Sequence, residues 1–159
     1  MSVCIRAAAP GDVPTILRFV RELAAFEREP DAVKATADTL AEALFGARPA
    51  AEAVIAEADQ PLGFALFFHN FSTWTGRRGL YLEDLYVTPA ARGRGVGTAL
   101  LRHLAALALE RGCARFEWAV LDWNVDAIGF YRGMGASGLD EWTVQRVAGD
   151  ALRHLAERH

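Results

Sequence analysis

The chain has 159 residues, of which 52% are hydrophobic and 23% are charged. This length is typical of one domain, here residues 1–159, and so many apolar side chains can form a core, which excludes an intrinsically disordered protein. Because the net charge is −3, we expect no nucleic-acid partner.

The first third of the chain predicts two helices. Apolar residues recur at helical spacing from Val13 to about Phe26, and Glu27 falls near the end of that helix. A second helix is expected from Thr36 to Phe45, with Gly46 as its end. Both helices carry an apolar stripe, so we expect both to pack against one core.

The apolar period then shortens to that of β-strands. Strands are expected at residues 51–57 and 62–68, joined by a turn into an antiparallel hairpin. Residues 70–79 hold turn formers and two arginines, so we expect a loop there. A third strand is expected from Leu80 to Val87.

A helix after this strand organises the predicted fold. Apolar residues from Gly97 to Ala108 share one helical face, Gly112 supplies the end, and a strand is expected from Arg115 to Leu121. Strand, helix and strand in this order form a crossover, which makes two neighbouring strands parallel. We therefore expect an α/β fold with a mixed central sheet, antiparallel in its N-terminal part and parallel around the crossover helix.

Three further elements are expected near the end of the chain. Asn124 is a natural N-cap for a short helix from Val125 to Arg132. Thr143 to Val147 predicts a late strand, and Asp150 to Arg158 predicts a helix. The sequence contains no internal repeat and no linker.

A glycine-rich turn precedes the crossover helix. Its residues are Arg92, Gly93, Arg94, Gly95, Val96 and Gly97, followed by Thr98. Free backbone N–H groups and the dipole at a helix N-terminus favour an anion, so a phosphate is the natural ligand. The alternative is an ordinary turn with solvated arginines. A P-loop is excluded because the turn has no lysine, and a dinucleotide fingerprint is excluded because Thr98 stands at its third glycine position.

The segment R-G-R-G-V-G resembles the Q/R-x-x-G-x-G/A pyrophosphate motif of the GCN5-related N-acetyltransferases, with Arg92, Gly95 and Gly97 at its fixed positions. The similarity extends through YLEDLYVTP before the turn and WNVDAIGFYRGMGA after it, so it covers about Leu62 to Ala136 and, more weakly, the first helix. The segments LYLEDLYV, STW and AVLDWN resemble the diamine acetyltransferases, particularly the thialysine branch. The resemblance implies a single-domain fold, acetyl-CoA as co-substrate and a homodimer.

Two adjacent carboxylates are candidates for the proton chemistry of acetyl transfer. Because an amine is mostly protonated at neutral pH, a carboxylate that binds the ammonium and accepts its proton is useful. Glu83 and Asp84 are neighbours on a predicted strand, so we expect their side chains on opposite faces. The resemblance implies that Glu83 is the water-mediated base and that Asp84 lines the amine pocket. The alternative is that one of them is a structural strand carboxylate.

The resemblance also implies the remaining catalytic and cofactor contacts. Tyr131 corresponds to the tyrosine that donates a proton to the departing thiolate, although a lone helical tyrosine is usually a packing residue. Asn124 corresponds to a cofactor contact as well as a helix cap. The backbone of Leu85 and Val87 corresponds to the strand that pairs with the pantetheine arm and polarises the acetyl carbonyl.

Trp74, Glu27 and Glu29 are candidates for a pocket that holds an aliphatic chain ending in a cation. An indole face and carboxylates both attract ammonium groups. The alternative for Trp74 is a loop anchor. Spermidine-preferring relatives carry an acidic residue and a proline before this tryptophan, whereas this chain has Ser72 and Thr73, which argues against spermidine. Thialysine, lysine-like amino acids and small diamines stay open.

Other features of the sequence limit the class of protein. Histidines and cysteines show no metal-ligand spacing, so we expect no metal. Cys4 and Cys113 are too few for a disulfide framework, and the N-terminal residues show no secretion signal, so we expect a cytoplasmic protein. No apolar run is long enough to predict a membrane partner. Two alternatives remain: a protein N-terminal or lysine acetyltransferase, and a non-catalytic acyl-CoA-binding module.

Overall fold

A computed structural model describes residues 2–157 of the chain. It divides into two compact units, the first ending at Leu121 and the second beginning at Asp122. None of the helices in the described part has the length and apolar character to cross a membrane.

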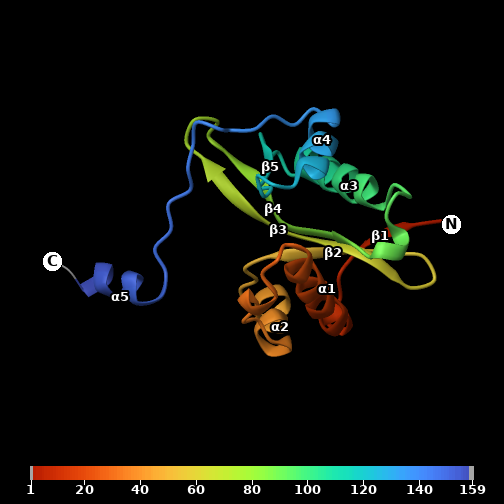
Figure 1. Cartoon of the computed structure of the whole chain (residues 1–159), viewed down its shortest axis with the longest axis horizontal. Helices are drawn as coiled ribbons and strands as arrows, with labels where there is room; N and C mark the ends of the chain where they lie inside the picture. Colours follow the sequence, from red (N-terminus) through yellow and green to blue (C-terminus); the bar gives the residue numbers. More distant parts are fainter. Residues whose placement is uncertain (1, 158–159) are drawn as a thin grey trace. The chain divides into compact units, whose positions relative to one another are not determined.

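The first unit is built around a five-stranded sheet (Figure 1). Its strands, in sequence and in sheet order, are β1 (Cys4–Ala7), β2 (Glu52–Glu57), β3 (Pro61–Ser72), β4 (Arg77–Val87) and β5 (Phe116–Trp118). Strands β1 to β4 pair with one another in antiparallel order, whereas β5 pairs with β4 in parallel. The predicted hairpin, crossover and mixed α/β sheet are therefore confirmed.

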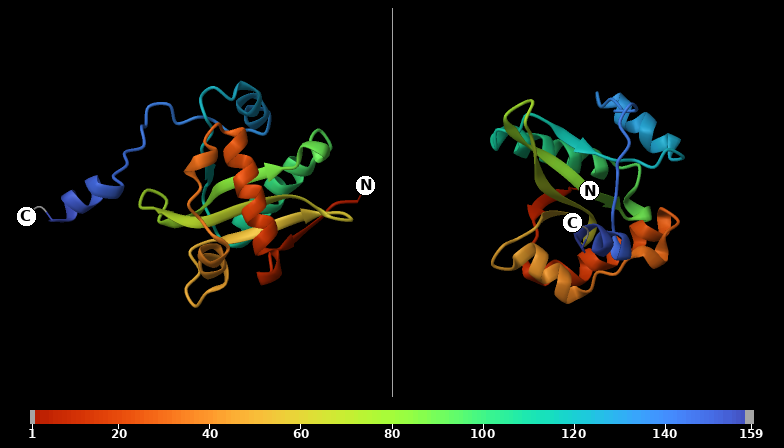
Figure 2. Two further views of the ribbon diagram at one scale, coloured as in Figure 1. Left: turned by 60° about the horizontal axis from the view of Figure 1, so that its bottom comes forward. Right: turned by 90° about the vertical axis from the view of Figure 1, so that its left-hand side faces the viewer.

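Helices cover both faces of this sheet (Figure 2). Helices α1 (Val13–Phe26) and α2 (Ala37–Phe45) lie on one face, and α3 (Val96–Glu110) lies on the other. Short 3-10 helices precede or follow them at η1 (Pro10–Asp12), η2 (Pro30–Ala32) and η3 (Pro89–Ala91). The core beneath α1 and α2 is apolar and closely packed, and its buried members are Ile16, Phe19, Leu44, Ala53, Ile55, Phe64 and Tyr86.

Residues 70–79 are not the loop that we predicted. β3 continues to Ser72 and β4 begins at Arg77, so only residues 73–76 form the turn. The polar side chains of this segment suggested a loop, but backbone pairing between two long strands needs no apolar side chains at the hairpin end. Gly76, with a φ of 65°, supplies the left-handed position of the turn. β5 is also shorter than the strand that we expected at 115–121.

The second unit contains α4 (Val125–Gly133) and α5 (Gly149–Glu157). Asn124 caps α4 as predicted, because its Oδ1 accepts a hydrogen bond from the Ala127 N–H at 3.3 Å. The strand predicted at 143–147 is absent from the described residues, so this prediction is wrong. A five-residue strand needs a neighbour for its backbone hydrogen bonds, and here Val144 is 86% exposed. Arg158, expected to end the last helix, lies outside the described residues.

Candidate active site

A β-bulge lies in the middle of β4. Leu66 of β3 faces Asp84, and the next β3 residue, Phe67, faces Leu82, so Glu83 has no opposite residue. A bulge bends a strand and disturbs the alternation of its side chains. The prediction that Glu83 and Asp84 point to opposite faces assumed an unbroken strand, so at this bulge it stays a prediction.

Three acidic side chains gather around this bulge. Glu27 caps the end of α1, and its charge acts on Asp84 together with that of Glu83. Burial and these two negative charges raise the pKa of Asp84 to about 6. Burial and the charge of Glu83 likewise raise the pKa of Glu27. Three predicted site residues therefore lie close enough for their charges to interact, and together their negative charges attract a cation.

Trp74 lies elsewhere on the first unit. It sits in the turn between β3 and β4, is 82% exposed, and is held by a backbone N–H that donates to the Ser72 Oγ at 3.2 Å. Glu83 follows the start of β4 at Arg77 by six residues, which corresponds to about 20 Å along a strand. The described chain therefore does not bring Trp74 to the acidic cluster, and Glu29 is likewise exposed, before η2.

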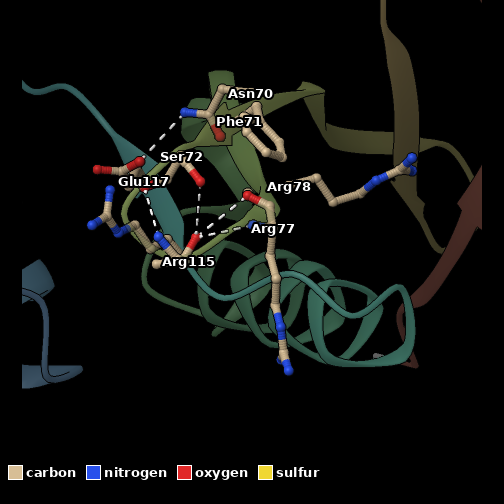
Figure 3. Close-up of a pocket in the computed structure, with 9 residues that line it drawn as sticks. Asn70, Phe71, Ser72, Arg77, Arg78, Arg115 and Glu117 are labelled. Atoms are coloured by element: carbon tan, nitrogen blue, oxygen red, sulfur yellow. Dashed lines mark hydrogen bonds between the residues drawn. The ribbon is translucent and has the colours of Figure 1, made fainter.

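A small pocket at the same end of the hairpin is not part of the candidate site (Figure 3). Its lining includes Asn70, Arg115 and Glu117, and Asn70 Nδ2 donates to Glu117 Oε1 at 3.4 Å. The side chains of Arg77 and Arg78 point in different directions, so they do not converge on one ligand. None of the predicted site residues lines it.

Beyond the bulge, one backbone edge of β4 is open. The parallel pairing with β5 ends at Leu82 and Trp118, whereas the pairing with β3 continues to Val87. Among the described residues, no strand pairs with the β5 side of β4 at residues 83–87. An extended ligand can hydrogen-bond to such an edge as an added strand would. Leu85 and Val87, predicted to meet the pantetheine arm, both lie on this stretch.

The glycine turn follows this edge, and its backbone leads into the start of α3. Gly93 and Gly95 have φ values of 78° and 81°, in the left-handed region that favours glycine. Gly95 is the N-cap of α3, so the N–H groups of Val96, Gly97 and Thr98 fall in the first helical turn, where they have no intrahelical acceptor. Such a helix start attracts a phosphate.

The positive charge of the turn is smaller than the sequence suggests. Residues 92–115 contain five arginines, but Arg111 lies beyond the last residue of α3, about 22 Å from its start. Its guanidinium is paired with Glu52, at 2.7 Å from Nη1 to Oε2. Arg92 and Arg94 are the two arginines within the turn itself. The groups of the turn that can attract a phosphate are therefore its backbone N–H groups and these two side chains.

Arg92 has contacts that could not be predicted from its position in the chain. Its Nε donates to the Val87 carbonyl oxygen at 3.0 Å, and its guanidinium lies over the rings of Phe26 and Tyr86. The Tyr86 hydroxyl donates to Glu22 Oε1 at 2.7 Å. Phe26, Tyr86 and Glu22 look like ordinary helix and strand residues in the sequence, and only the spatial arrangement connects them with the turn.

The predicted proton donor belongs to the second unit. Tyr131 lies on α4, is half-buried, and packs its ring 5.5 Å from that of Phe130. Asn124 caps the same helix. The roles of both residues toward the cofactor stay predictions.

Comparisons with known proteins cover nearly the whole chain. The pattern of the Acetyltransferase (GNAT) family matches residues 17–136. A thialysine N-epsilon-acetyltransferase from Sus scrofa is 41% identical, over 98% of each chain. An L-ornithine N5-acetyltransferase from Arabidopsis thaliana is 32% identical, over 95% of this chain and 86% of the relative. Among solved structures, an integron cassette protein from V. cholerae has a TM-score of 0.81 and 31% identity, over 99% of each chain.

Proposed function

Because this chain belongs to the GNAT family and is an acetyl-CoA-dependent N-acetyltransferase, we propose that its acceptor is the primary amine of a small molecule. Thialysine, a lysine-like amino acid or a diamine fits this proposal. The observation that carries it is the acidic cluster of Glu27, Glu83 and Asp84 at the bulge where the edge of β4 opens. A cationic acceptor and an extended acyl carrier are thus attracted to the same short stretch of strand.

Two curated relatives support an amino acid with a side-chain amine as the acceptor. One is named for thialysine and the other for ornithine. The negative charges of the cluster favour such amines over neutral acceptors. Ser72 and Thr73 stand where the resemblance leads us to expect an acidic residue and a proline in spermidine-preferring relatives. Because this turn lies away from the acidic cluster, spermidine is kept in the test panel.

In the proposed mechanism, the acceptor enters as an ammonium ion and loses a proton before it attacks. Glu83 is the exposed, unpaired residue of the bulge, and it takes this proton through water. The amine nitrogen then forms a bond to the thioester carbonyl carbon, and N–H groups on the open edge of β4 stabilise the oxyanion. When the carbon–sulfur bond breaks, the thiolate leaves and receives a proton from Tyr131. The nitrogen loses its remaining extra proton through water, and this proton restores the phenol of Tyr131.

Residues of the glycine turn and the β4 edge hold acetyl-CoA in this proposal. Backbone N–H groups from Gly93 to Thr98, with the side chains of Arg92 and Arg94, bind the pyrophosphate. Leu85 and Val87 pair with the pantetheine arm, and Asn124 supplies a further contact. No group of three potential metal ligands occurs among residues 2–157, and the proposed transfer uses no metal.

We further propose that the protein is a cytoplasmic homodimer and that residues 1–159 form one functional domain. Exposed apolar side chains of the second unit, including Trp142 at 65% and Val144 at 86%, support an additional contact surface. Cys4 and Cys113 are both free thiols, which suits a reducing compartment.

The test is release of free thiol from acetyl-CoA by the purified protein with a panel of amines: thialysine, lysine, ornithine, short diamines, spermidine and a basic peptide. We expect release with small amines, and thialysine or ornithine at the lowest KM. Glu83→Gln should lower kcat by about 100-fold or more, because a positioned base contributes about 10²–10⁴-fold. Release with the peptide alone would move the protein to the protein-modifying class. If no amine causes thiol release although the protein binds acetyl-CoA, this result would favour a non-catalytic module.

A further inference from the structure

Arg92 joins three elements of the first unit through one side chain. Its guanidinium carbon lies 5.3 Å from the ring centroid of Phe26 and 5.6 Å from that of Tyr86. Its Nε donates to the Val87 carbonyl oxygen at 3.0 Å. A residue of the glycine turn therefore contacts both the last residue of α1 and the end of β4, by cation–π contacts and a hydrogen bond.

A second contact ties the same two elements together. Tyr86 is only 5% exposed, its ring centroid lies 5.5 Å from that of Phe19, and its hydroxyl donates to Glu22 at 2.7 Å. Glu22 and Phe26 are four residues apart on α1, so they lie on one side of the helix. The side chain of Tyr86 is thus held in place by the core and by Glu22, and the guanidinium of Arg92 lies over its ring.

The last turn of α1 matters because Glu27 follows Phe26 directly. Glu27 is close enough to Glu83 and Asp84 for their charges to act on one another. Phe26 is itself 47% exposed, so deep burial in the core does not fix it. Its stacking with Arg92 is one of the contacts that hold the end of α1, from which the Glu27 carboxylate follows.

We propose that Arg92 is a positioning residue for the amine site: by holding Phe26 against β4, it places Glu27 beside Asp84 and couples that site to the phosphate-binding turn. The inference rests on the proposed function, because it assigns Glu27 to the amine. A phosphate on the turn orders the neighbouring guanidinium, and the ordered guanidinium holds the end of α1. Acetyl-CoA and the amine then favour each other's binding, and this coupling is reciprocal.

The variant Phe26→Leu tests this role, since it removes the aromatic face while Arg92, Arg94 and the backbone N–H groups of the turn are all retained. We expect the KM of the amine to rise about two- to fivefold, as the loss of a cation–π contact worth about 0.5–1 kcal/mol implies. The dissociation constant of acetyl-CoA should stay within about twofold, and Phe26→Tyr should restore the amine KM. Phe71→Leu, an exposed aromatic change on β3, is the matched control and should alter neither constant.

Amide hydrogen exchange with CoA alone separates this inference from the proposed function, because it needs no amine. Binding of CoA should slow exchange at residues 24–28 of the wild type but not of Phe26→Leu. A wild type that binds CoA without any change at residues 24–28 would overturn the coupling. An unchanged amine KM in Phe26→Leu would overturn the positioning role even if thiol release confirms the enzyme. Absence of thiol release, with slowed exchange present, would instead refute the acceptor assignment.

Discussion

Asp84 should make the protein less stable as the pH rises through about 6. Its pKa in the folded state is raised from 3.8 to about 6 by burial and by the charges of Glu83 and Glu27. A carboxyl group whose pKa is raised on folding favours the folded state while it is protonated, and this contribution is lost as the pH passes its folded pKa. Replacing Asp84 with Asn removes the ionisation and keeps the shape of the side chain.

The size of the effect follows from the shift. About two pKa units correspond to about 3 kcal/mol, since one unit is about 1.4 kcal/mol. Asp84 retains some contact with solvent, which lowers the expected gain to about 1–3 kcal/mol. For a chain of this size, that gain corresponds to a rise of roughly 3–10 °C in Tm at pH 8.

The assay is thermal unfolding of wild type and Asp84→Asn from pH 4 to pH 8. The difference in Tm between the two proteins should be smallest near pH 4 and should grow through pH 6, because other titrating groups are shared and cancel. Asp84→Asn should also raise the KM of a cationic amine, because the acidic cluster then has two negative charges instead of three. A difference in Tm that is constant across the range would refute the assigned environment of Asp84.

Three further changes test other parts of the molecule. Tyr131→Phe should lower kcat while the acetyl-CoA dissociation constant changes little, and unchanged turnover would remove the proton-donor role. Gly95→Glu should raise that dissociation constant at least tenfold, because it strains a left-handed position and places a negative charge at the phosphate turn; isothermal titration would show it. Arg6→Gln should lower Tm at pH 7, and this loss should shrink as the pH falls toward 3. Arg6 forms an ion pair with Asp12 and lowers the pKa of that carboxyl group. The stability from this pair is therefore present above the ordinary Asp pKa and is lost as Asp12 becomes protonated.

Elements with a strong local period could be predicted from the sequence. The first helix was expected from Val13 to about Phe26 and is found at those residues, because its apolar stripe and its end are both local features. The crossover helix and the parallel pair that it connects were equally predictable. The prediction of a strand at 143–147 was wrong because a strand depends on a pairing partner, which its own local sequence does not specify.

The candidate site was predictable in its residue types but not in its arrangement. Glu27, Glu83 and Asp84 were all expected, yet the bulge that joins them arises from how β3 and β4 pair, and nothing in either strand alone indicates it. The contact of Arg92 with Phe26 likewise joins residues 66 positions apart. Trp74 was expected near the acceptor because an indole face attracts ammonium groups, whereas it lies in the turn of the hairpin, away from the acidic cluster.

The candidate site lies where the regularity of the sheet ends. The bulge leaves Glu83 unpaired, β5 ends opposite Leu82 and leaves the next edge open, and the two left-handed glycines then turn the chain into α3. Each irregularity exposes a different group. The bulge exposes a carboxylate, the end of β5 exposes backbone N–H and C=O groups of β4, and the glycines expose the start of α3. Because all three occur between residues 82 and 97, a proton acceptor, a strand edge for the acyl carrier and a phosphate cradle follow one another along one continuous backbone. Extending β5 by two paired residues should therefore weaken acetyl-CoA binding even if every side chain named above is retained.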